Sequence, residues 1–354
     1  MENKKFTVGG SEYINSLIQR AVNEGTRTAT VTGNYEIDKP VRIPSDFTLI
    51  LENCHLRLAD GSFTNIFVNE HHSTEIGKTV SGCDRNIKII GRGEAILDGG
   101  EYNGLSEKTH NKNGFPAIWN NNMILFTNVE NFEIRRIAAR NQRWWALCFI
   151  YARNGRISDV DFCACDIGVR EDGTTYRGLK RGFYKEALVK NADGIDLRVG
   201  CQNIVIENIT GFTEDDTIAL SALNGGLERT FGVEGLPTDL CNVEIRNIAS
   251  SAYCSNVRLL SQGTYKVHDI YIEGVFDSSQ NSPHMERGGA GVRIGDPHIY
   301  ETRHSNSDET YNITIRKVRS RAVCSVALYG GIGNLVMEDI ESFDGGGDIQ
   351  DLRM

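Results

Sequence analysis

A short unit recurs along the chain and constrains its fold more than any other feature of the sequence. It reads Asn or a substitute, aliphatic, any residue, aliphatic, any residue, polar, aliphatic, and its copies begin at Asn86, Asn131, Asn154, Asn203, Asn242, Asp269, Asn312 and Asn334. Successive starts differ by 45, 23, 49, 39, 27, 43 and 22 residues. The short steps have the length of one coil, and the long steps are two coils, some with an insertion. Self-similarity at this period, with aliphatic residues alternating, is typical of a solenoid.

We therefore predict an all-β protein, a right-handed parallel β-helix in which each copy is a strand. Successive coils would stack about 4.8 Å apart. The repeated Asn would then have a structural role, because its amide can bond to the copies above and below it.

The residues before the first copy predict a cap on one end of the solenoid. Residues 11–24 carry apolar side chains at helical spacing, with Ser11 as the expected N-cap. After Gly25 the period changes to two, and short strands are expected at 28–31, 35–37, 41–43, 48–51 and 55–58. A helix in front of many strands suits a solenoid whose open end must be covered. We expect one domain over 1–354, divided into the cap (1–25), the coils (26–340) and a C-terminal tail (341–354).

Composition excludes several classes of function. The formal net charge of −9 and the absence of a basic stripe argue against nucleic-acid binding. No apolar run approaches 18 residues and the N-terminus has no signal-peptide pattern, so we expect a cytoplasmic protein with no membrane partner. The nine cysteines include no CxxC pair and are expected to be buried thiols. The histidines show no metal-ligand spacing, and we expect neither a metal nor a cofactor.

Two acidic clusters lie one coil apart in the middle of the chain. Asp193 stands in an Asn-Ala-Asp-Gly run that begins at Asn191, and the pair Asp215 and Asp216 follows 22 to 23 residues later. In a β-helix these three carboxylates would converge on one patch of surface. Crowded carboxylates cannot all ionise, so one stays protonated while another stays charged. Cleavage of a glycosidic bond needs one acid and one carboxylate in those two states.

Long polar segments occupy the same half of the chain. Residues 166–190, 222–239 and 277–310 are too long and too polar to be turns. Long loops on a rigid scaffold usually build binding sites. We expect them to border the acidic patch and to close its cleft at one end.

Five motifs resemble the polygalacturonase-like enzymes of glycoside hydrolase family 28, in the pectin-lyase-like β-helix superfamily. In chain order they are GRGEAILDG at 91–99, NQRWW at 141–145, NADGID at 191–196, EDDTIAL at 214–220 and GVRIG at 291–295. The resemblance covers most of the chain and implies a glycosidase that inverts the anomeric configuration. It implies Asp215 as the general acid and Asp193 with Asp216 as the base acting on a water.

The substrate-binding residues expected beside this trio are Asn191, Trp145, Tyr253 and Arg293. Arg293 takes the Arg of the family's G-V-R-I-K motif, and Tyr253 falls near the family's Gly-His-Gly, where this chain has no His. The family's Lys is replaced by Gly295. Because these family residues are implicated in handling a uronate carboxylate, their loss makes polygalacturonate a doubtful substrate. We expect an exo-acting enzyme on an oligosaccharide or glycoside, either pectin-related or non-uronic.

Two other readings of the sequence remain open. A polysaccharide lyase or epimerase could use the same fold, with the three aspartates as calcium ligands. A non-catalytic carbohydrate-binding β-helix is the other alternative, against which the paired acidic motifs argue. The sequence leaves the sugar, the linkage and the oligomeric state open.

Overall fold

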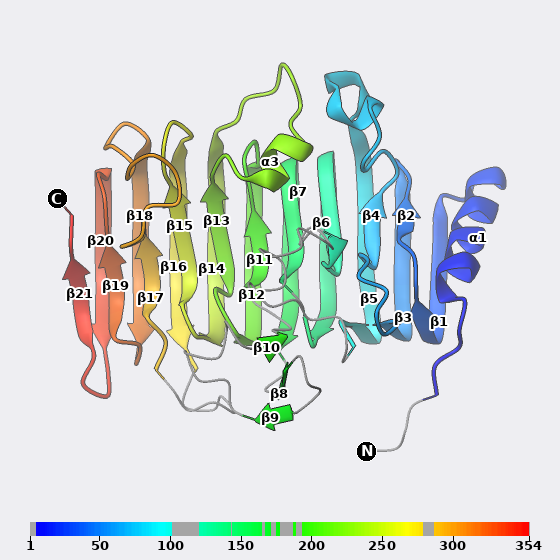
Figure 1. Ribbon diagram of the computed structural model, residues 1–354, viewed down its shortest axis with the longest axis horizontal. Helices are drawn as coiled ribbons and strands as arrows, with labels where there is room; N and C mark the ends of the chain where they lie inside the picture. The colour runs from blue at the N-terminus through cyan, green and yellow to red at the C-terminus, as the bar shows by residue number, and fades with distance from the viewer. Residues whose placement is uncertain are drawn as a thin grey trace.

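The protein, in a computed structural model, is a parallel β-helix closed at one end by a helix (Figure 1). The side chains of residues 5–100, 120–142, 144–164, 193–278 and 287–353 are described, together with the backbone of three short strands between 167 and 188. The predicted fold class is confirmed. Within the described residues, no helix has the length and apolarity needed to cross a membrane.

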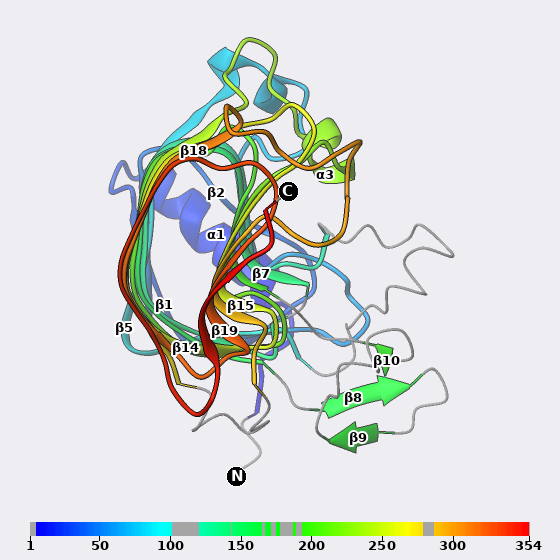
Figure 2. The ribbon, with the colours of Figure 1, turned by 90° about the vertical axis from the view of Figure 1, so that its left-hand side faces the viewer.

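Two ladders of parallel strands run the length of the solenoid. Seen along the long axis, the coils superpose almost on one another (Figure 2). The first ladder comprises β1 (Thr28–Ile37), β3 (Phe47–Leu58), β5 (Asp84–Asp98), β6 (Ile124–Arg140), β7 (Trp145–Cys163), β12 (Gln202–Thr213), β14 (Leu240–Ala252), β16 (Val267–Asp277), β18 (Thr310–Ser320) and β20 (Gly333–Ser342). The second comprises β2 (Val41–Ile43), β4 (Phe67–Asn69), the first parts of β6 and β7, β11 (Asp193–Leu197), β13 (Ile218–Ala222), β15 (Ser255–Ser261), β17 (Ala290–Ile294), β19 (Cys324–Leu328) and β21 (Gly347–Asp351).

Smaller elements lie outside the two ladders. They are α1 (Gly10–Asn23), the 3-10 helices η1 (Ile76–Lys78) and η2 (Val80–Gly82), the short helix α3 (Gly226–Thr230), and β8 (Ile167–Arg170), β9 (Thr175–Arg177) and β10 (Ala187–Leu188). The last three form a small antiparallel sheet beside the solenoid (Figure 2).

The core is built from stacked aliphatic side chains, one per coil. In the first ladder one stack runs through Ile157, Ile206, Ile245, Ile272, Ile315 and Met337. In the second, another runs through Leu147, Ile195, Ile218, Val257, Val292, Val326 and Ile349. Most of these side chains are fully buried. The alternation that the repeat predicted therefore places every second side chain of these strands inside the coil.

The repeated Asn forms the ladder that the sequence predicted. Asn203 donates to Asn154 at 3.0 Å, and Asn242 donates to Asn203 at 3.1 Å. All eight copies have a positive φ, between 49° and 58°. Asn adopts this left-handed conformation more readily than most residues, because its short side chain can bond locally. The ladder thus fixes a corner in successive coils.

The helix α1 covers the first coil, as predicted, but its N-terminus differs from the expectation. Gly9 is the N-cap, and Ser11 lies inside the helix and is buried. The Ser11 hydroxyl accepts hydrogen bonds from the backbone N–H groups of Asp38 and Lys39, both at 3.1 Å. Ser11 therefore attaches the cap to the first coil instead of capping the helix. Ile14 and Ile18 close the end of the core.

The last coil reaches further than the sequence indicated. β21 pairs in parallel with β19, from Cys324 opposite Gly347 to Leu328 opposite Asp351. Much of the segment expected as a tail from residue 341 is thus part of a coil. All five residues of β21 are exposed.

Candidate active site

Asp193, Asp215 and Asp216 meet where β11 and β13 begin. Ile195 of β11 lies opposite Ile218 of β13, so the turn before β13 is adjacent to the start of β11. One carboxylate oxygen of each aspartate lies within 4.8 Å of those of the other two. The Asp193 carboxylate also accepts a hydrogen bond from the backbone N–H of Asp216 at 2.8 Å. The convergence that we expected from the one-coil spacing is present in the structure.

The three carboxylates differ in their access to solvent. Asp216 is completely buried, and Asp193 is 8% exposed. Asp215 is half-buried and is the one of the three that lines a cavity of about 560 Å³. A ligand in this cavity would therefore meet Asp215 first, with the other two carboxylates behind it.

Burial and mutual repulsion separate the protonation states of the group. Burial, followed by the charge of Asp216, raises the pKa of Asp215 to about 6, although the Cys254 thiol donates a hydrogen bond to it. Burial, followed by the charges of Asp196 and Asp215, raises the pKa of Asp193 well above its ordinary value. A carboxylic acid with a pKa near 6 is partly protonated at neutral pH, as a general acid must be.

Asp216 is held by hydroxyl and guanidinium donors. It accepts a hydrogen bond from the Ser255 hydroxyl at 2.6 Å and from Arg258 at 3.3 Å, and Arg293 lies 3.7 Å away. Both arginines also pair with Asp296, at 2.7 Å and 3.5 Å respectively. Each of these contacts places positive charge or a hydrogen-bond donor beside the buried Asp216 carboxylate.

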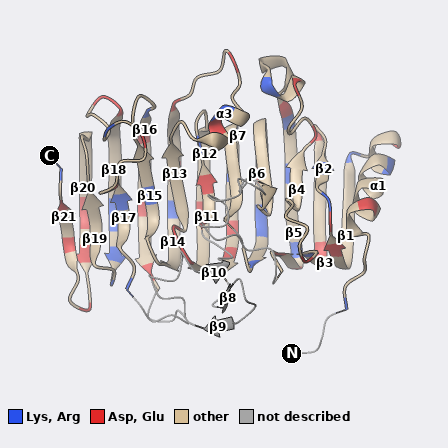
Figure 3. Ribbon diagram, in the orientation of Figure 1, with Lys and Arg blue, Asp and Glu red and all other residues tan. Residues whose placement is uncertain are grey.

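The two arginines form one rung of the ladder on the cavity side of the sheet. Arg258 of β15 lies directly opposite Arg293 of β17, and both line the cavity. The ribbon of Figure 3 shows basic positions in blue on both strands. Arg293 was predicted at the site, whereas Arg258 and Asp296 were missed. The sequence does hold a signal for Arg258, because a Val-Arg-aliphatic run at 257–259 repeats at 292–294.

A fourth carboxylate, Asp196, lies beside the trio and was also missed. It is completely buried, and its charge is one of the causes that raise the pKa of Asp193. Burial raises its pKa to about 8, although Arg198 lies 3.5 Å away. Arg198 donates to Glu228 at 2.8 Å and lies over the Trp145 ring, 4.7 Å from its centre.

The other predicted substrate-binding residues lie in different surroundings. Trp145 is half-buried and lies opposite Asp193 in the ladder, one coil away from it. Tyr253 is 5% exposed and packs in a small cluster with Ala164 and Phe212. Asn191 lies outside the described residues, as does most of the expected loop at 166–190. Substrate contact by any of these residues stays a prediction.

The motif positions that differ from the family have structural explanations. Gly295 has a φ of +74°, and a Cβ there would lie 2.5 Å from the Tyr329 carbonyl oxygen. A lysine at this position would be strained, so the cavity has no ammonium group where the resembled motif carries one. Asp98 of the first motif ends β5, where it accepts hydrogen bonds from Asn141 and Gly100 and pairs with His55. Its role there is structural.

The aspartate trio has the donor chemistry of a divalent-cation site, because calcium and magnesium prefer carboxylate oxygens. Arg258 and Arg293, however, already neutralise Asp216 at 3.3 Å and 3.7 Å. A cation bound to Asp216 would lie close to two guanidinium groups of the same charge sign. The trio therefore fits proton transfer better than it fits a metal. A second group of possible ligands, Glu70, His71 and Asp84, lies near β4 and β5.

Comparisons with known proteins identify the fold. A scan against protein-family models finds no match, and a search of curated proteins finds no similar sequence. Among solved structures, a 1,3-α-1,4-β-D-galactose-4-sulfate-3,6-anhydro-D-galactose-2-sulfate 4 galactohydrolase has a TM-score of 0.61 at 12% identity, covering 95% of this chain and 85% of its own.

Two further structures resemble the chain over most of its length. A polygalacturonase from Erwinia carotovora has a TM-score of 0.53 at 15% identity, covering 95% of this chain and 91% of its own. The A-module of a mannuronan C-5 epimerase from Azotobacter vinelandii has a TM-score of 0.53 at 13% identity, covering 93% of this chain and 72% of its own. At these identities the likeness establishes the parallel β-helix and leaves the activity to be argued from the site.

Proposed function

We propose that this protein is a glycoside hydrolase that cleaves a glycosidic bond in an oligosaccharide or glycoside. One observation carries the proposal: three carboxylates converge, and the one facing the cavity, Asp215, has a pKa raised to about 6. Such a group can give a proton to the leaving oxygen while a neighbouring carboxylate stays ionised. The hydrolases among the similar structures add support from the fold.

In the proposed mechanism Asp215 is the general acid, and Asp193 with Asp216 forms the base. Within that pair Asp216 is the carboxylate paired with two arginines, whereas burial raises the pKa of Asp193 well above its ordinary value. Asp216 is buried, and its oxygens are engaged by Ser255, Arg258 and Arg293. A carboxylate held in this way cannot approach the anomeric carbon as a nucleophile. It can act through a water, and attack by water from the opposite face inverts the configuration.

The short spacing of the carboxylates is the observation that most favours retention of the anomeric configuration. Oxygens within 4.8 Å of one another are closer than the roughly 6.5–9.5 Å between carboxyl groups that is usual for inversion. Proton NMR of the first-formed anomer separates the two outcomes directly. We expect inversion, and a retained anomer would assign Asp193 as a nucleophile.

The substrate at the catalytic cavity is proposed to be pectin-related or non-uronic. Arg258 and Arg293 are both paired with carboxylates, and Gly295 supplies no cation. This arrangement favours a sugar that places no uronate carboxyl beside Arg258, Arg293 and Gly295. The exo mode also stays a prediction, as does a cytoplasmic location.

Turnover of a substrate panel tests the proposal. Wild-type protein would be assayed with aryl glycosides and with neutral and pectic oligosaccharides, beside the Asp215→Asn and Asp193→Asn variants. We expect hydrolysis of at least one panel member and a loss of about 10³-fold or more in each variant, with thermal unfolding unchanged to within a few degrees. Full activity of the two variants would refute the assignment.

A lyase or epimerase is the second candidate, because the trio could serve as calcium ligands. Either enzyme should lose activity with a chelator. A lyase should also give the ultraviolet absorbance of an unsaturated product, and an epimerase should change the sugar without cleaving the chain.

A non-catalytic carbohydrate-binding β-helix predicts binding of the same panel with no turnover at all.

A further inference from the structure

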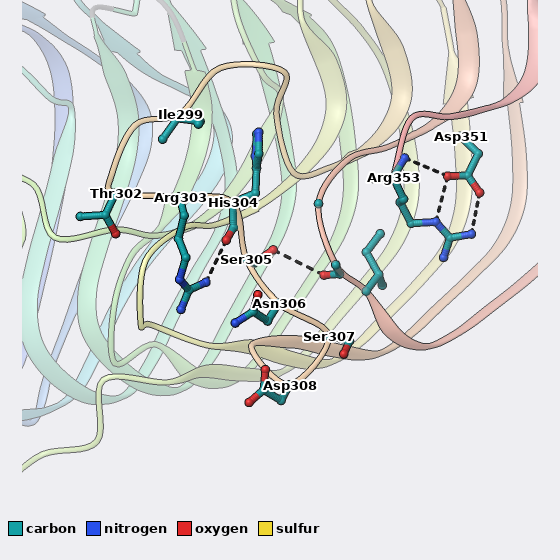
Figure 4. A pocket seen from close by; sticks show the side chains of 13 residues that line it. Ile299, Thr302, Arg303, His304, Ser305, Asn306, Ser307, Asp308, Asp351 and Arg353 are labelled. Carbon is teal, nitrogen blue, oxygen red and sulfur yellow. Dashed lines mark hydrogen bonds and ion pairs between the residues drawn. The ribbon is translucent and has the colours of Figure 1, made fainter.

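A second, larger cavity of about 1,330 Å³ lies beyond the carboxyl ends of β17, β19 and β21 (Figure 4). Its lining comes from the 299–308 segment after β17, the turn at 330–332 after β19, and Asp351 with Arg353 at the end of β21. None of the three catalytic aspartates lines it.

Neighbouring residues of the chain line the two cavities. Tyr329 lines the active-site cavity and Gly330 the second one. Likewise, Gln350 lines the active-site cavity and its neighbour Asp351 the second one. Tyr300 lines the active-site cavity, and its neighbour Ile299 lines the second. The cavities therefore adjoin at the ends of three strands on successive coils.

The shared wall is rigid. The Gln262 side chain accepts hydrogen bonds from the backbone N–H groups of Tyr300 and Glu301, and donates to the His298 carbonyl at 2.7 Å. Further along, Arg303 makes two hydrogen bonds to Glu309, at 2.7 Å and 2.6 Å. A wall that is already ordered loses little conformational entropy when a ligand binds.

The groups presented by this wall suit a sugar chain. Ile299 and Tyr300 are 56% and 53% exposed where the cavities adjoin, an unusual position for large apolar side chains on a polar loop. The Arg258 guanidinium lies over the Tyr300 ring, 5.4 Å from its centre, and the exposed part of the ring offers an apolar surface to the faces of sugar rings. Thr302, Asn306 and Ser307 are exposed beyond it (Figure 4), and in the described part of the chain no group hydrogen-bonds to their side chains. They are available to hydroxyl groups.

Both guanidinium groups of the second cavity are paired with carboxylates. Arg303 pairs with Glu309, and Arg353 pairs with Asp351 at 2.5 Å. Asp308 adds a further negative charge to the lining. Because both guanidinium groups are already paired with carboxylates, the cavity does not attract an anionic sugar.

We propose that the second cavity binds neutral sugar units of an oligosaccharide whose reacting bond lies at Asp215. The sugar chain would extend from Asp215 past Arg258 and Arg293 and then over Tyr300 to Asn306 and Ser307. This inference rests on the proposed function. It defines the substrate as a neutral oligosaccharide long enough to reach both cavities.

Binding measurements test the inference apart from turnover. Isothermal titration on the Asp215→Asn variant would use galacto-, xylo-, manno- and gluco-oligosaccharides of two and five units, with oligogalacturonates of the same lengths for comparison. We expect one neutral series in which the five-unit ligand binds at least tenfold more tightly than the two-unit ligand. Ser307→Trp, which fills the cavity, should abolish this gain and leave the two-unit Kd unchanged, and Asn306→Ala should reduce it.

The matched control is Ser81→Trp, a substitution at an exposed serine of η2 that should leave every Kd unchanged. Circular dichroism would verify folding of each variant. The inference is overturned if no neutral ligand binds, if Kd does not depend on length, if Ser307→Trp keeps the gain, or if oligogalacturonates bind most tightly. Length-dependent binding without hydrolysis by the wild type would instead refute the proposed function and leave the second cavity as a sugar site.

Discussion

At the scale of single residues, the site depends on the different surroundings of four neighbouring carboxyl groups. Asp215 faces the cavity, Asp216 is held by two arginines, and Asp193 and Asp196 are buried side by side. Residues of the same type thereby acquire different protonation states. This division is what an acid and a base in one site require.

The raised pKa of Asp215 predicts the alkaline limb of the pH–rate profile. The catalytic form is the protonated acid, so kcat/KM should fall tenfold per pH unit above about 6, where this proton is lost. The profile would be measured on the substrate found in the panel. Activity that stays constant from pH 5 to 8 would contradict Asp215 as the acid.

Asp196 predicts a pH dependence of stability. Its pKa is raised to about 8 in the folded protein, whereas the unfolded value is near 3.8. The folded state therefore keeps a proton that the unfolded state loses, and stability falls as pH rises from about 4 to about 8. Asp196→Asn should remove this loss, because its neutral amide does not ionise.

The measurement is thermal unfolding of both proteins at pH 5 and pH 8. At about 1.4 kcal/mol per unit, the shift sets an upper limit of several kcal/mol on the gain of Asp196→Asn at pH 8. The gain should shrink toward pH 5. An equal effect at both pH values would show that Asp196 does not titrate in this range.

At the scale of elements, the corners of the coils are fixed by the Asn ladder. Asn203 has a φ of +57° and bonds to Asn154 and Asn242 on both sides. The strands beside it then enter each coil in the same register. That register brings β11 beside β13, and so Asp193 beside Asp216.

Two substitutions at Asn203 separate the hydrogen bonds from the backbone conformation. Asn203→Gly removes the amide but tolerates a positive φ, and should cost about 1 kcal/mol of unfolding free energy. Asn203→Ala adds left-handed strain and should cost roughly 1 kcal/mol more. Urea unfolding measures both, and equal costs would show that the conformation carries no strain.

At the scale of the whole molecule, stability is distributed along one axis. Each coil contacts its two neighbours, α1 covers the first coil, and the last coil ends in an exposed strand. A solenoid of this kind gains its stability from interfaces between adjacent coils. The candidate site begins on β11 and β13, which have further coils on both sides.

Hydrogen exchange should follow this arrangement. Amides of β20 and β21 should exchange much faster than those of β11, β13 and β15, because the last coil is stabilised from one side only. Mass spectrometry of exchanged peptides measures the difference. Equal protection would mean that the exposed edge of β21 is covered in solution.

The local pattern of residues specifies the coil. The period of the repeat, the alternating aliphatic residues and the Asn at each corner act locally, and each copy favours the same strand and corner. The meeting of Asp193 with Asp215 and Asp216 follows from that period, because a one-coil spacing becomes adjacency once the chain winds. The cap helix was also predictable, although its attachment through Ser11 was not.

Three features depend on contacts between distant parts of the chain. They are the choice of the carboxyl group that faces the cavity, the presence of Arg258 and Asp296 at the site, and the second cavity beside it. The burial of a carboxyl group, and the electrostatic field at it, depend on groups from several coils and loops together. Asp216 pairs with Arg258 and Arg293, which lie on two later coils, and Arg258 pairs in turn with Asp296. No local sequence pattern predicts this combination of charges. Periodicity fixes which residues become neighbours, whereas side-chain packing fixes what those neighbours do to one another.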